Sequence, residues 1–379
     1  MTALLFGTYN ARHAANAILA DDLRAAGWRV TECHEPLWER TRDKGAAYFS
    51  PTGLARLALG YARAVARLTR RFRVAAADAD VLVAGFNGQL DVILLRRLAG
   101  RRPILFAPLV TVTETLVDDR RSYAPDSTVA RLLRSIDRAS LSAADLVLLD
   151  TATHRDWAVR EVGLDPARAL VQYLGAEALF EESPAPPRTG MGLPTSPVRV
   201  LFYGQYLPLH GTDLIARAIA SIRPDEGIAF ELVGTGSERA ACESLLRDAP
   251  HVHFEDWIAY EDLPGRLRSA DLVLGIFGAS EKARMVVPNK VWQAAAVGRA
   301  IVTADTPAIR EVFVAGESIR LVEREPAALA AAIRELAGDE AARERLGAGA
   351  REAALRVAGA GVRAARLRER LARLVAEGA

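Results

Sequence analysis

Short apolar runs rich in β-branched residues alternate with helical periodicity along the whole chain. This alternation is typical of parallel sheets whose strands are joined by helical crossovers. In the first half the pattern predicts strands at 3–6, 28–32, 81–84, 103–106, 145–149 and 170–173. The second half repeats it, with strands expected at 198–203, 228–233, 251–254, 271–276, 300–303 and 318–321, followed by a helical tail over 326–377. The fold class predicted is α/β, with two Rossmann-like domains.

A proline-rich segment separates the two halves. Residues 181–197 read EESPAPPRTGMGLPTSP, and such a mixture of proline, glycine and small polar residues is typical of a linker. We therefore expect domains at 1–180 and 198–360, and a C-terminal helix at 361–379 that packs back on the first domain. Two such domains joined by a hinge are expected to face each other across a ligand cleft.

Composition narrows the class of protein. The chain has 379 residues, half of them apolar, which is enough for two cores, and a formal net charge of only +2. That balance argues against a nucleic-acid binder that relies on bulk positive charge. Cys33 and Cys242 stand far apart, which suggests a reducing compartment. The chain enters a strand-like run at once, without a charged leader, and no apolar run approaches 18 residues, so we expect a cytoplasmic protein.

Small and polar residues follow the first strand of each half. Gly7-Thr8-Tyr9-Asn10 comes directly after the first strand, where backbone amides can face an anion or hydroxyl groups. A tight structural turn explains the same residues equally well.

The matching loop of the second half is longer. It runs from Gly204 and Gln205 to His210 and Gly211, and Gly234 ends the next strand. His210 could donate to a phosphate or a sugar, although a loop histidine is more often solvated. The Gly-x-Gly at Gly234 is weak evidence, since a structural turn accounts for it.

A stronger signal lies at 288–290, where Pro-Asn-Lys precedes an alanine-rich helix that stops at Gly298. Pro288 suits the first turn of a helix, which leaves the amides of Asn289 and Lys290 free at the positive end of the helix dipole. Lys290 adds a full charge for a phosphate to meet. The alternative is a surface lysine that happens to follow a proline.

Residues 54–73 predict an amphipathic helix with one apolar stripe and arginines on the opposite face. Such a helix could contact an anionic membrane surface. It could also be an ordinary domain helix whose apolar stripe packs on the protein core, and we favour this second interpretation. His251 and His253 alternate on a strand without further ligands at suitable spacing, so no metal site is predicted.

Taken together, these features resemble the donor-binding half of glycosyltransferases with the GT-B fold, in family 4 (glycosyl transferases group 1). The resemblance rests on VLFYGQYLPLHGTDLIARAI, ELVGTGSERAACESL, HFEDWIAYEDLPGRLRSADLVLGIFG and KARMVVPNKVWQAAAVGRAIVTADTPAIREV, in that order and spacing. The segment ADLVLLDTATHRDWAVREVGLDPARALVQYLGAEALF resembles the family's approach to the hinge. The resemblance covers most of the chain, strongly after residue 140 and weakly before it.

The resemblance implies that the second domain holds a nucleotide-sugar. The base would meet backbone near Phe254–Ile258, and the diphosphate would meet the loop at 204–211 and the helix start at 288–290. The donor-binding residues implied are Gly204, Gln205, Gly211, Gly234, Asp256, Trp257, Ile258, Pro288, Asn289, Lys290 and Gln293.

The sequence departs from the family at its two glutamates, whose positions hold Met285 and Gln293. An amide can still hydrogen-bond to a ribose diol, so Gln293 is the expected ribose ligand. Glu281 is a candidate stand-in for the first glutamate. Lys290, Lys282 or Arg284 would supply positive charge for the leaving diphosphate, and we name Lys290, His210 and Glu281 as the catalytic candidates.

The first domain of such an enzyme binds the acceptor. The candidates on that side are Gly7, Thr8, Tyr9, Asn10, Glu114, Asp118 and Arg120, with Asp119, Asp150 and His154 as further polar residues.

The resemblance thus implies a retaining, metal-independent glycosyltransferase that uses a nucleoside diphosphate sugar, of UDP or GDP type, and no separate cofactor. One alternative is a non-catalytic protein that binds a nucleotide-sugar as a partner or sensor. Another is an epimerase or hydrolase on the same fold. The acceptor is not identified, and the basic helix at 54–73 favours, weakly, contact with the inner face of a membrane.

Overall fold

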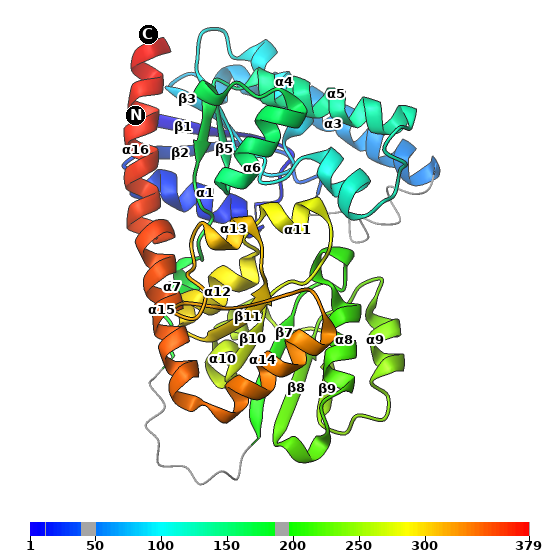
Figure 1. Cartoon of the computed structure of the whole chain (residues 1–379). Helices are drawn as coiled ribbons and strands as arrows, with labels where there is room; N and C mark the ends of the chain where they lie inside the picture. The colour runs from blue at the N-terminus through cyan, green and yellow to red at the C-terminus, as the bar shows by residue number, and fades with distance from the viewer. Residues whose placement is uncertain (12, 39–50, 186–196, 379) are drawn as a thin grey trace. The chain divides into compact units, whose positions relative to one another are not determined.

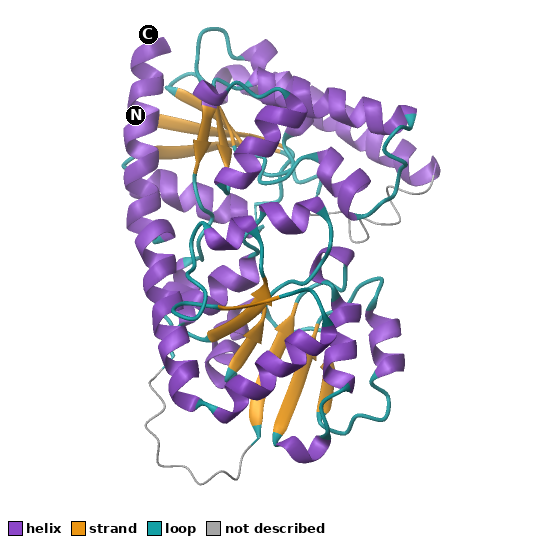
Figure 2. Cartoon of the chain, viewed as in Figure 1, coloured by secondary structure: helices purple, strands orange, loops and turns teal. Residues whose placement is uncertain are grey.

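The computed structural model describes residues 1–11, 13–38, 51–185 and 197–378 (Figures 1 and 2). The chain divides into two compact units. Unit 1 comprises residues 1–117, 123–173 and 360–379, and unit 2 comprises residues 118–122 and 174–359. The chain therefore passes from unit 1 to unit 2 and returns after residue 359.

Unit 1 is built on a six-stranded parallel sheet in the order β2-β1-β3-β4-β5-β6. Its strands are β1 (Thr2–Gly7), β2 (Arg29–His34), β3 (Val81–Ala84), β4 (Ile104–Phe106), β5 (Leu146–Leu149) and β6 (Ala169–Val171). The order of the strands reverses between β1 and β3, so this is the switch point where an open α/β sheet receives ligands.

Helices cover this sheet on both faces. They are α1 (Ala14–Ala25), α3 (Pro51–Ala75), α4 (Gln89–Leu98), α5 (Thr128–Ala143), α6 (Ala152–Trp157) and α16 (Ala360–Gly378), with π-helical turns η1 (Glu114–Asp119) and η2 (Ala158–Val162) and the 3-10 turn η3 (Pro166–Arg168). Helix α16 packs on α1 and contributes Leu367 and Leu371 to a core that includes Leu5 and Leu23.

Unit 2 repeats the plan with the order β12-β11-β10-β7-β8-β9, again all parallel. Its strands are β7 (Val198–Tyr203), β8 (Ile228–Val233), β9 (Val252–Glu255), β10 (Leu272–Leu274), β11 (Ala300–Ala304) and β12 (Arg320–Val322). Here the switch point lies between β7 and β10.

The helices of unit 2 alternate with these strands. They are α7 (Ala178–Glu181), α8 (Thr212–Ala220), α9 (Arg239–Leu245), α10 (Leu263–Ser269), α11 (Glu281–Met285), α12 (Asn289–Val297), α13 (Pro307–Arg310), α14 (Pro326–Gly338) and α15 (Glu340–Ala358), with 3-10 turns η4 (Pro208–His210), η5 (Pro224–Glu226) and η6 (Tyr260–Asp262). Helix α8 packs on α9 and α14, and α12 packs on α7, α10 and α15.

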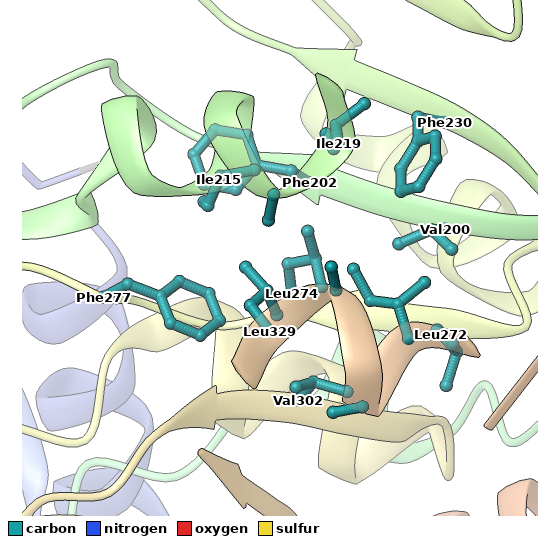
Figure 3. Close-up of a cluster of buried hydrophobic side chains, with 14 of the residues drawn as sticks. Val200, Phe202, Ile215, Ile219, Phe230, Leu272, Leu274, Phe277, Val302 and Leu329 are labelled. Carbon is teal, nitrogen blue, oxygen red and sulfur yellow. The ribbon is translucent and has the colours of Figure 1, made fainter. Parts of the chain in front are cut away.

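The core of unit 2 lies between its sheet and helices α8 and α14 (Figure 3). Phe202 and Phe230 project from β7 and β8 towards Ile215 and Ile219 of α8, and Leu329 of α14 completes the cluster. All five side chains are essentially removed from water, so this layer fixes the carboxyl end of β7, from which the loop at 204–211 departs.

The predicted α/β class and the twelve predicted strands are confirmed, with ends that differ by a few residues. Gly298 ends α12 in the left-handed conformation (φ 82°), as expected for a helix C-terminus. The expected helical tail at 326–377 is three helices, because the chain turns at Asp339 and Gly359. Of the expected linker at 181–197, residues 186–196 lie outside the described residues, and Glu181 closes α7.

Candidate functional site

The loops after β7 and β10 meet at the switch point of unit 2. The amides of Phe277 and Gly278 donate to the carbonyls of His210 and Leu209 (3.0 and 3.2 Å). Gly211 has φ 64°, and a Cβ there would lie 2.5 Å from the carbonyl carbon of Phe277. Glycine is therefore required at this position both for its conformation and for the close approach of the two loops.

Gly234 makes the neighbouring contact at the end of β8. It has φ 120°, and a Cβ there would lie 1.9 Å from the carbonyl oxygen of Gly204. The Gly-x-Gly thus brings two loop backbones together. This close packing holds Gly204 in place at the carboxyl end of β7.

Lys290 lies next to Gly204 and is the most informative residue of this site. Its side chain is 5% exposed, and Nζ has no hydrogen-bond partner among the described residues. Nζ lies 3.9 Å from the ring centroid of Phe202 and 3.3 Å from where a Cβ on Gly204 would stand. Burial lowers the pKa of Lys290 well below its usual value. A buried ammonium without an anionic partner is costly, so this position is suited to a ligand that brings negative charge.

His210 approaches the same point. A Cβ on Gly204 would lie 3.2 Å from its Cε1 atom, and its Nδ1–H donates to the carbonyl of Gln205. Burial and, next, the charge of Lys290 lower the pKa of His210 well below its usual value. The ring is half-buried rather than solvated, and Gln205 is exposed.

Helix α12 directs its N-terminus to this region. Pro288 is the N-cap (φ −70°, ψ 151°) and Asn289 is the first helical residue, so Pro288 stands one position before the predicted first turn. The amides of Asn289 and Lys290 belong to the first turn, whose N–H groups have no acceptor within the helix. An anion can bind here, because these amides and the Lys290 ammonium can both donate to it. Gly204 has no side chain to block its approach to Lys290 Nζ.

Gln293, one turn further along α12, is 3% exposed and is hydrogen-bonded to its neighbours through both its oxygen and its nitrogen. Its Oε1 accepts from the Tyr203 hydroxyl (2.9 Å), and its Nε2 donates to the Tyr260 hydroxyl (2.8 Å) and towards Glu177 Oε2 (3.4 Å). Tyr260 in turn donates to Glu177 Oε1. We call these four residues the Glu177 cluster; sequence reasoning missed Glu177, Tyr203 and Tyr260, because no spacing links them.

The segment expected near a base lies after β9. Asp256 and Trp257 are exposed, the latter by 77%, and Ile258 is half-buried. Arg239, which sequence reasoning also missed, pairs with Asp256 (3.2 Å) and Glu243 (2.7 Å). Unlike Lys290, Arg239 therefore has its carboxylate partners within the protein.

The other charged candidates lie on α11. Glu281 is exposed and has Arg284 3.8 Å away, whereas Lys282 is 8% exposed. Met285 is 1% exposed, so the position that the resemblance assigned to the first glutamate holds a buried apolar side chain.

In unit 1 the loop after β1 is tied to a carboxylate on α4. The Thr8 amide and hydroxyl donate to Asp91 Oδ2 (2.7 and 3.0 Å), and a Cβ on Gly7 would lie 2.4 Å from the same oxygen. Burial raises the pKa of Asp91 to about 6, although the bonds from Thr8 and Tyr61 lower it. Tyr9 donates to Glu32 (3.0 Å), and the Asn10 carbonyl accepts from Asn16 (2.9 Å).

Three further candidates form a buried triad. His154 is completely buried, with Nδ1 2.7 Å from Asp150 Oδ1 and Nε2 3.0 Å from Glu114 Oε2. Burial alone would lower the pKa of His154, but the carboxylates of Glu114 and Asp150 outweigh it and raise that pKa to about 10. Both ring nitrogens already face carboxylates, and within the described ranges no group of three or more His, Cys, Asp or Glu side chains could hold a metal ion.

The candidates Glu114, Asp118 and Arg120 do not all belong to the same unit. Glu114 belongs to unit 1, whereas Asp118 and Arg120 belong to the short segment 118–122 that groups with unit 2. Asp118 and Arg120 are half-buried.

Helix α3 packs as an ordinary domain helix over its second half. Leu68 and Phe72 are buried, and Phe72 meets Phe6 of β1 edge-on (ring centroids 5.7 Å apart). Arg67 and Arg71 both pair with Glu35 (2.7 and 3.0 Å). A membrane span would need a longer or more apolar helix than any in the part of the chain described here.

Part of the chain is similar in sequence to known proteins. Residues 197–339 match the family model described as "Glycosyl transferases group 1". A curated relative, the D-inositol 3-phosphate glycosyltransferase of Thermomonospora curvata, is 28% identical over 272 residues, which cover 64% of this chain and 61% of the relative. The chain therefore spans about three fifths of that protein's length.

Solved structures share the fold over nearly the whole chain. Sucrose-phosphate synthase from Thermosynechococcus elongatus superposes with a TM-score of 0.75 at 17% identity, covering 99% of both chains. The Anabaena protein HepE, solved in complex with UDP-glucose, superposes with a TM-score of 0.70 at 16% identity, covering 98% of this chain and 100% of that one. The predicted two-domain GT-B fold is thereby confirmed.

Proposed function

We propose that this chain is a glycosyltransferase that takes its sugar from a nucleoside diphosphate sugar bound to unit 2. The observation that carries the proposal is Lys290, a buried cation with no hydrogen-bond partner among the described residues, beside the first turn of α12 and Gly204. A diphosphate would supply the missing negative charge and would accept from the free amides of Asn289 and Lys290. The family match over residues 197–339 covers the elements that carry this site.

The chemistry proposed is electrostatic stabilisation of the departing diphosphate. Its charge grows as the bond to the sugar breaks, and the Lys290 ammonium and the α12 amides lie where they can stabilise that charge. His210, beside Lys290, is a further donor to the same oxygens. We also propose retention of configuration and independence of metal, which rest on the resemblance to family 4.

Unit 1 is proposed to provide the acceptor surface. The loop Gly7–Asn10 lies at the carboxyl end of β1, next to the switch point of that sheet. Asp91 orders the loop by accepting from the amide and hydroxyl of Thr8. Thr8 and Tyr9 are buried, and Asn10 is half-buried.

The first test is calorimetric titration of the whole chain with UDP, GDP, dTDP and ADP. We expect binding of UDP or GDP in the micromolar range, about −8 kcal/mol at 1 μM. The HepE structure with UDP-glucose favours UDP as the first choice. A folded sample that binds none of the four would overturn the proposed donor site.

Turnover then separates the possible functions. A transferase releases nucleoside diphosphate from the matching nucleotide-sugar only when an acceptor-containing cell extract is present. Binding without release under those conditions would identify a non-catalytic partner or sensor. Free or epimerised sugar formed without extract would identify a hydrolase or an epimerase.

Helix α3 is proposed as a peripheral contact with anionic membrane. Arg56, Arg63 and Arg70 are exposed on it, and each basic residue near such a surface contributes about 1 kcal/mol. Replacing all three with glutamine should therefore weaken co-sedimentation with phosphatidylserine-containing vesicles by about 100-fold. Equal binding of the wild type to neutral and anionic vesicles would contradict this role.

A further inference from the structure

The Glu177 cluster contains a carboxylate that no motif of the sequence assigns to the site. Glu177 precedes α7, which packs on α12, and it reaches the cluster from outside the region matched by the family model. Glu177 is half-buried, and the hydroxyl-bearing Tyr260 is 43% exposed, so the cluster reaches the surface of unit 2. A ligand could therefore approach these groups.

Gln293 has little hydrogen-bonding capacity left. A side-chain amide offers two N–H donors and one oxygen with two lone pairs. Both donors are directed to Tyr260 and Glu177, and one lone pair accepts from Tyr203. Its remaining lone pair can accept from one hydroxyl, which is not enough for both hydroxyls of a vicinal diol.

Glu177 has the capacity that Gln293 lacks. An ionised carboxylate has about four lone-pair positions and no donor. Tyr260 occupies one position on Oε1, and Gln293 occupies one on Oε2. About two positions remain, one on each oxygen, which suits two adjacent hydroxyl groups that both donate.

We infer that Glu177, held in place by Tyr260 and Gln293, is the residue that recognises the 2′- and 3′-hydroxyls of the ribose. The inference rests on the proposed nucleotide-sugar site. It assigns Tyr203, Tyr260 and Gln293 to positioning, because their polar groups are directed at one another and at Glu177. The carboxylate missing from position 293 is thus supplied from a different part of the chain.

The test compares ribo- and 2′-deoxyribonucleotides on the whole chain, with UDP against 2′-deoxy-UDP and GDP against 2′-deoxy-GDP, by calorimetry. The wild type should prefer the ribonucleotide by about tenfold or more, since a charged hydrogen bond is lost in the deoxy form. Glu177→Gln should reduce that preference to about threefold or less and leave the affinity for the deoxynucleotide within about threefold of the wild type.

Matched variants show which residue recognises the diol. Gln293→Leu removes one of the two bonds that position Glu177 but keeps the carboxylate and its bond from Tyr260, so it should retain part of the preference. Glu182→Gln, on an exposed glutamate of the same segment, should retain all of it. Circular dichroism and thermal melting show that each variant is folded. If Glu177→Gln does not fold, Glu177→Asp, which keeps the charge but withdraws it by one methylene, should likewise reduce the preference.

The outcomes distinguish the inference from the function on which it rests. If no nucleoside diphosphate binds the wild type, the proposed function and the inference both fall. If UDP or GDP binds but Glu177→Gln keeps the wild-type preference, the inference is wrong and the donor site stands. Equal affinity of the wild type for the ribo and deoxy forms also overturns the inference alone.

Discussion

Replacing Lys290 with methionine should abolish measurable binding of nucleoside diphosphate and, with it, turnover. Removing one partner of a buried charged pair costs about 2–5 kcal/mol, which is a loss of affinity of about 30-fold or more. The same variant should be more stable than the ligand-free wild type by about 1–3 kcal/mol, because it removes a buried ammonium that has no hydrogen-bond partner among the described residues and keeps an apolar side chain near Phe202. Calorimetry and urea unfolding measure the two effects.

The pH dependence gives an independent check. The unfolded chain holds the Lys290 proton up to a pKa of about 10.4, whereas burial lowers the pKa in the folded state. Between the lowered pKa of the folded state and about 10.4 the unfolded state binds more protons, so stability should rise with pH over that interval. This rise should be absent from Lys290→Met when the two proteins are compared.

A matched control is Arg217→Met, which removes an exposed cation paired with Asp213 on α8. It should leave nucleotide affinity unchanged and alter stability by about 0.5 kcal/mol or less. If Lys290→Met binds nucleotide as the wild type does, Lys290 is not the diphosphate ligand.

Replacing His154 with leucine should destabilise unit 1 by about 3–5 kcal/mol. The change leaves Glu114 and Asp150 buried without their shared cation, and a broken buried ion pair costs about that much. Neutralising the partners as well, with Glu114→Gln and Asp150→Asn, should recover about 1 kcal/mol or more. Chemical denaturation of the three proteins measures these differences.

The sign of the pH effect follows from the raised pKa of His154. Its pKa is about 10 in the folded protein and about 6.5 unfolded, so the triad's contribution is full below about pH 6.5. It is lost as the pH rises through about 10, and the wild type should converge on the variant over that range. His253→Leu, at an exposed histidine of β9, is the control and should be nearly neutral. Equal effects of the two substitutions would contradict the ion-paired triad.

The inner strands could be predicted because they are short apolar runs that are buried on both faces. Every residue of β3 and β11 is buried. Their sequences are therefore nearly continuous apolar runs, unlike the mixed apolar and polar pattern of an amphipathic helix. The start of α12 could also be predicted, since proline fixes its own φ and is common at the start of a helix. These signals are local, so each of them lies entirely within one short stretch of sequence.

The site was predictable only where its residues are neighbours in the chain. Asn289 and Lys290 form one dipeptide, but Glu177 meets Gln293 across 116 residues, and His154 meets Glu114 across 40. Glu114 and His154 are both polar candidates in the sequence, but nothing in the sequence indicates that they pair. The burial of Lys290 could not be predicted from the sequence either, because its Nζ lies against the loop at Gly204 and the ring of Phe202, which are distant in the chain.

The return of the chain to unit 1 after residue 359 has a consequence for its synthesis. Leu367 and Leu371 of α16 fill the core beside α1, and Arg363 forms a buried ion pair with Asp22 (3.0 Å). A nascent chain therefore cannot close this core until all of unit 2 has left the ribosome. Unit 2, which is continuous over 174–359 apart from one short segment, can fold first, although unit 1 is translated earlier. Until α16 emerges, the face of α1 that packs on it stays exposed to solvent.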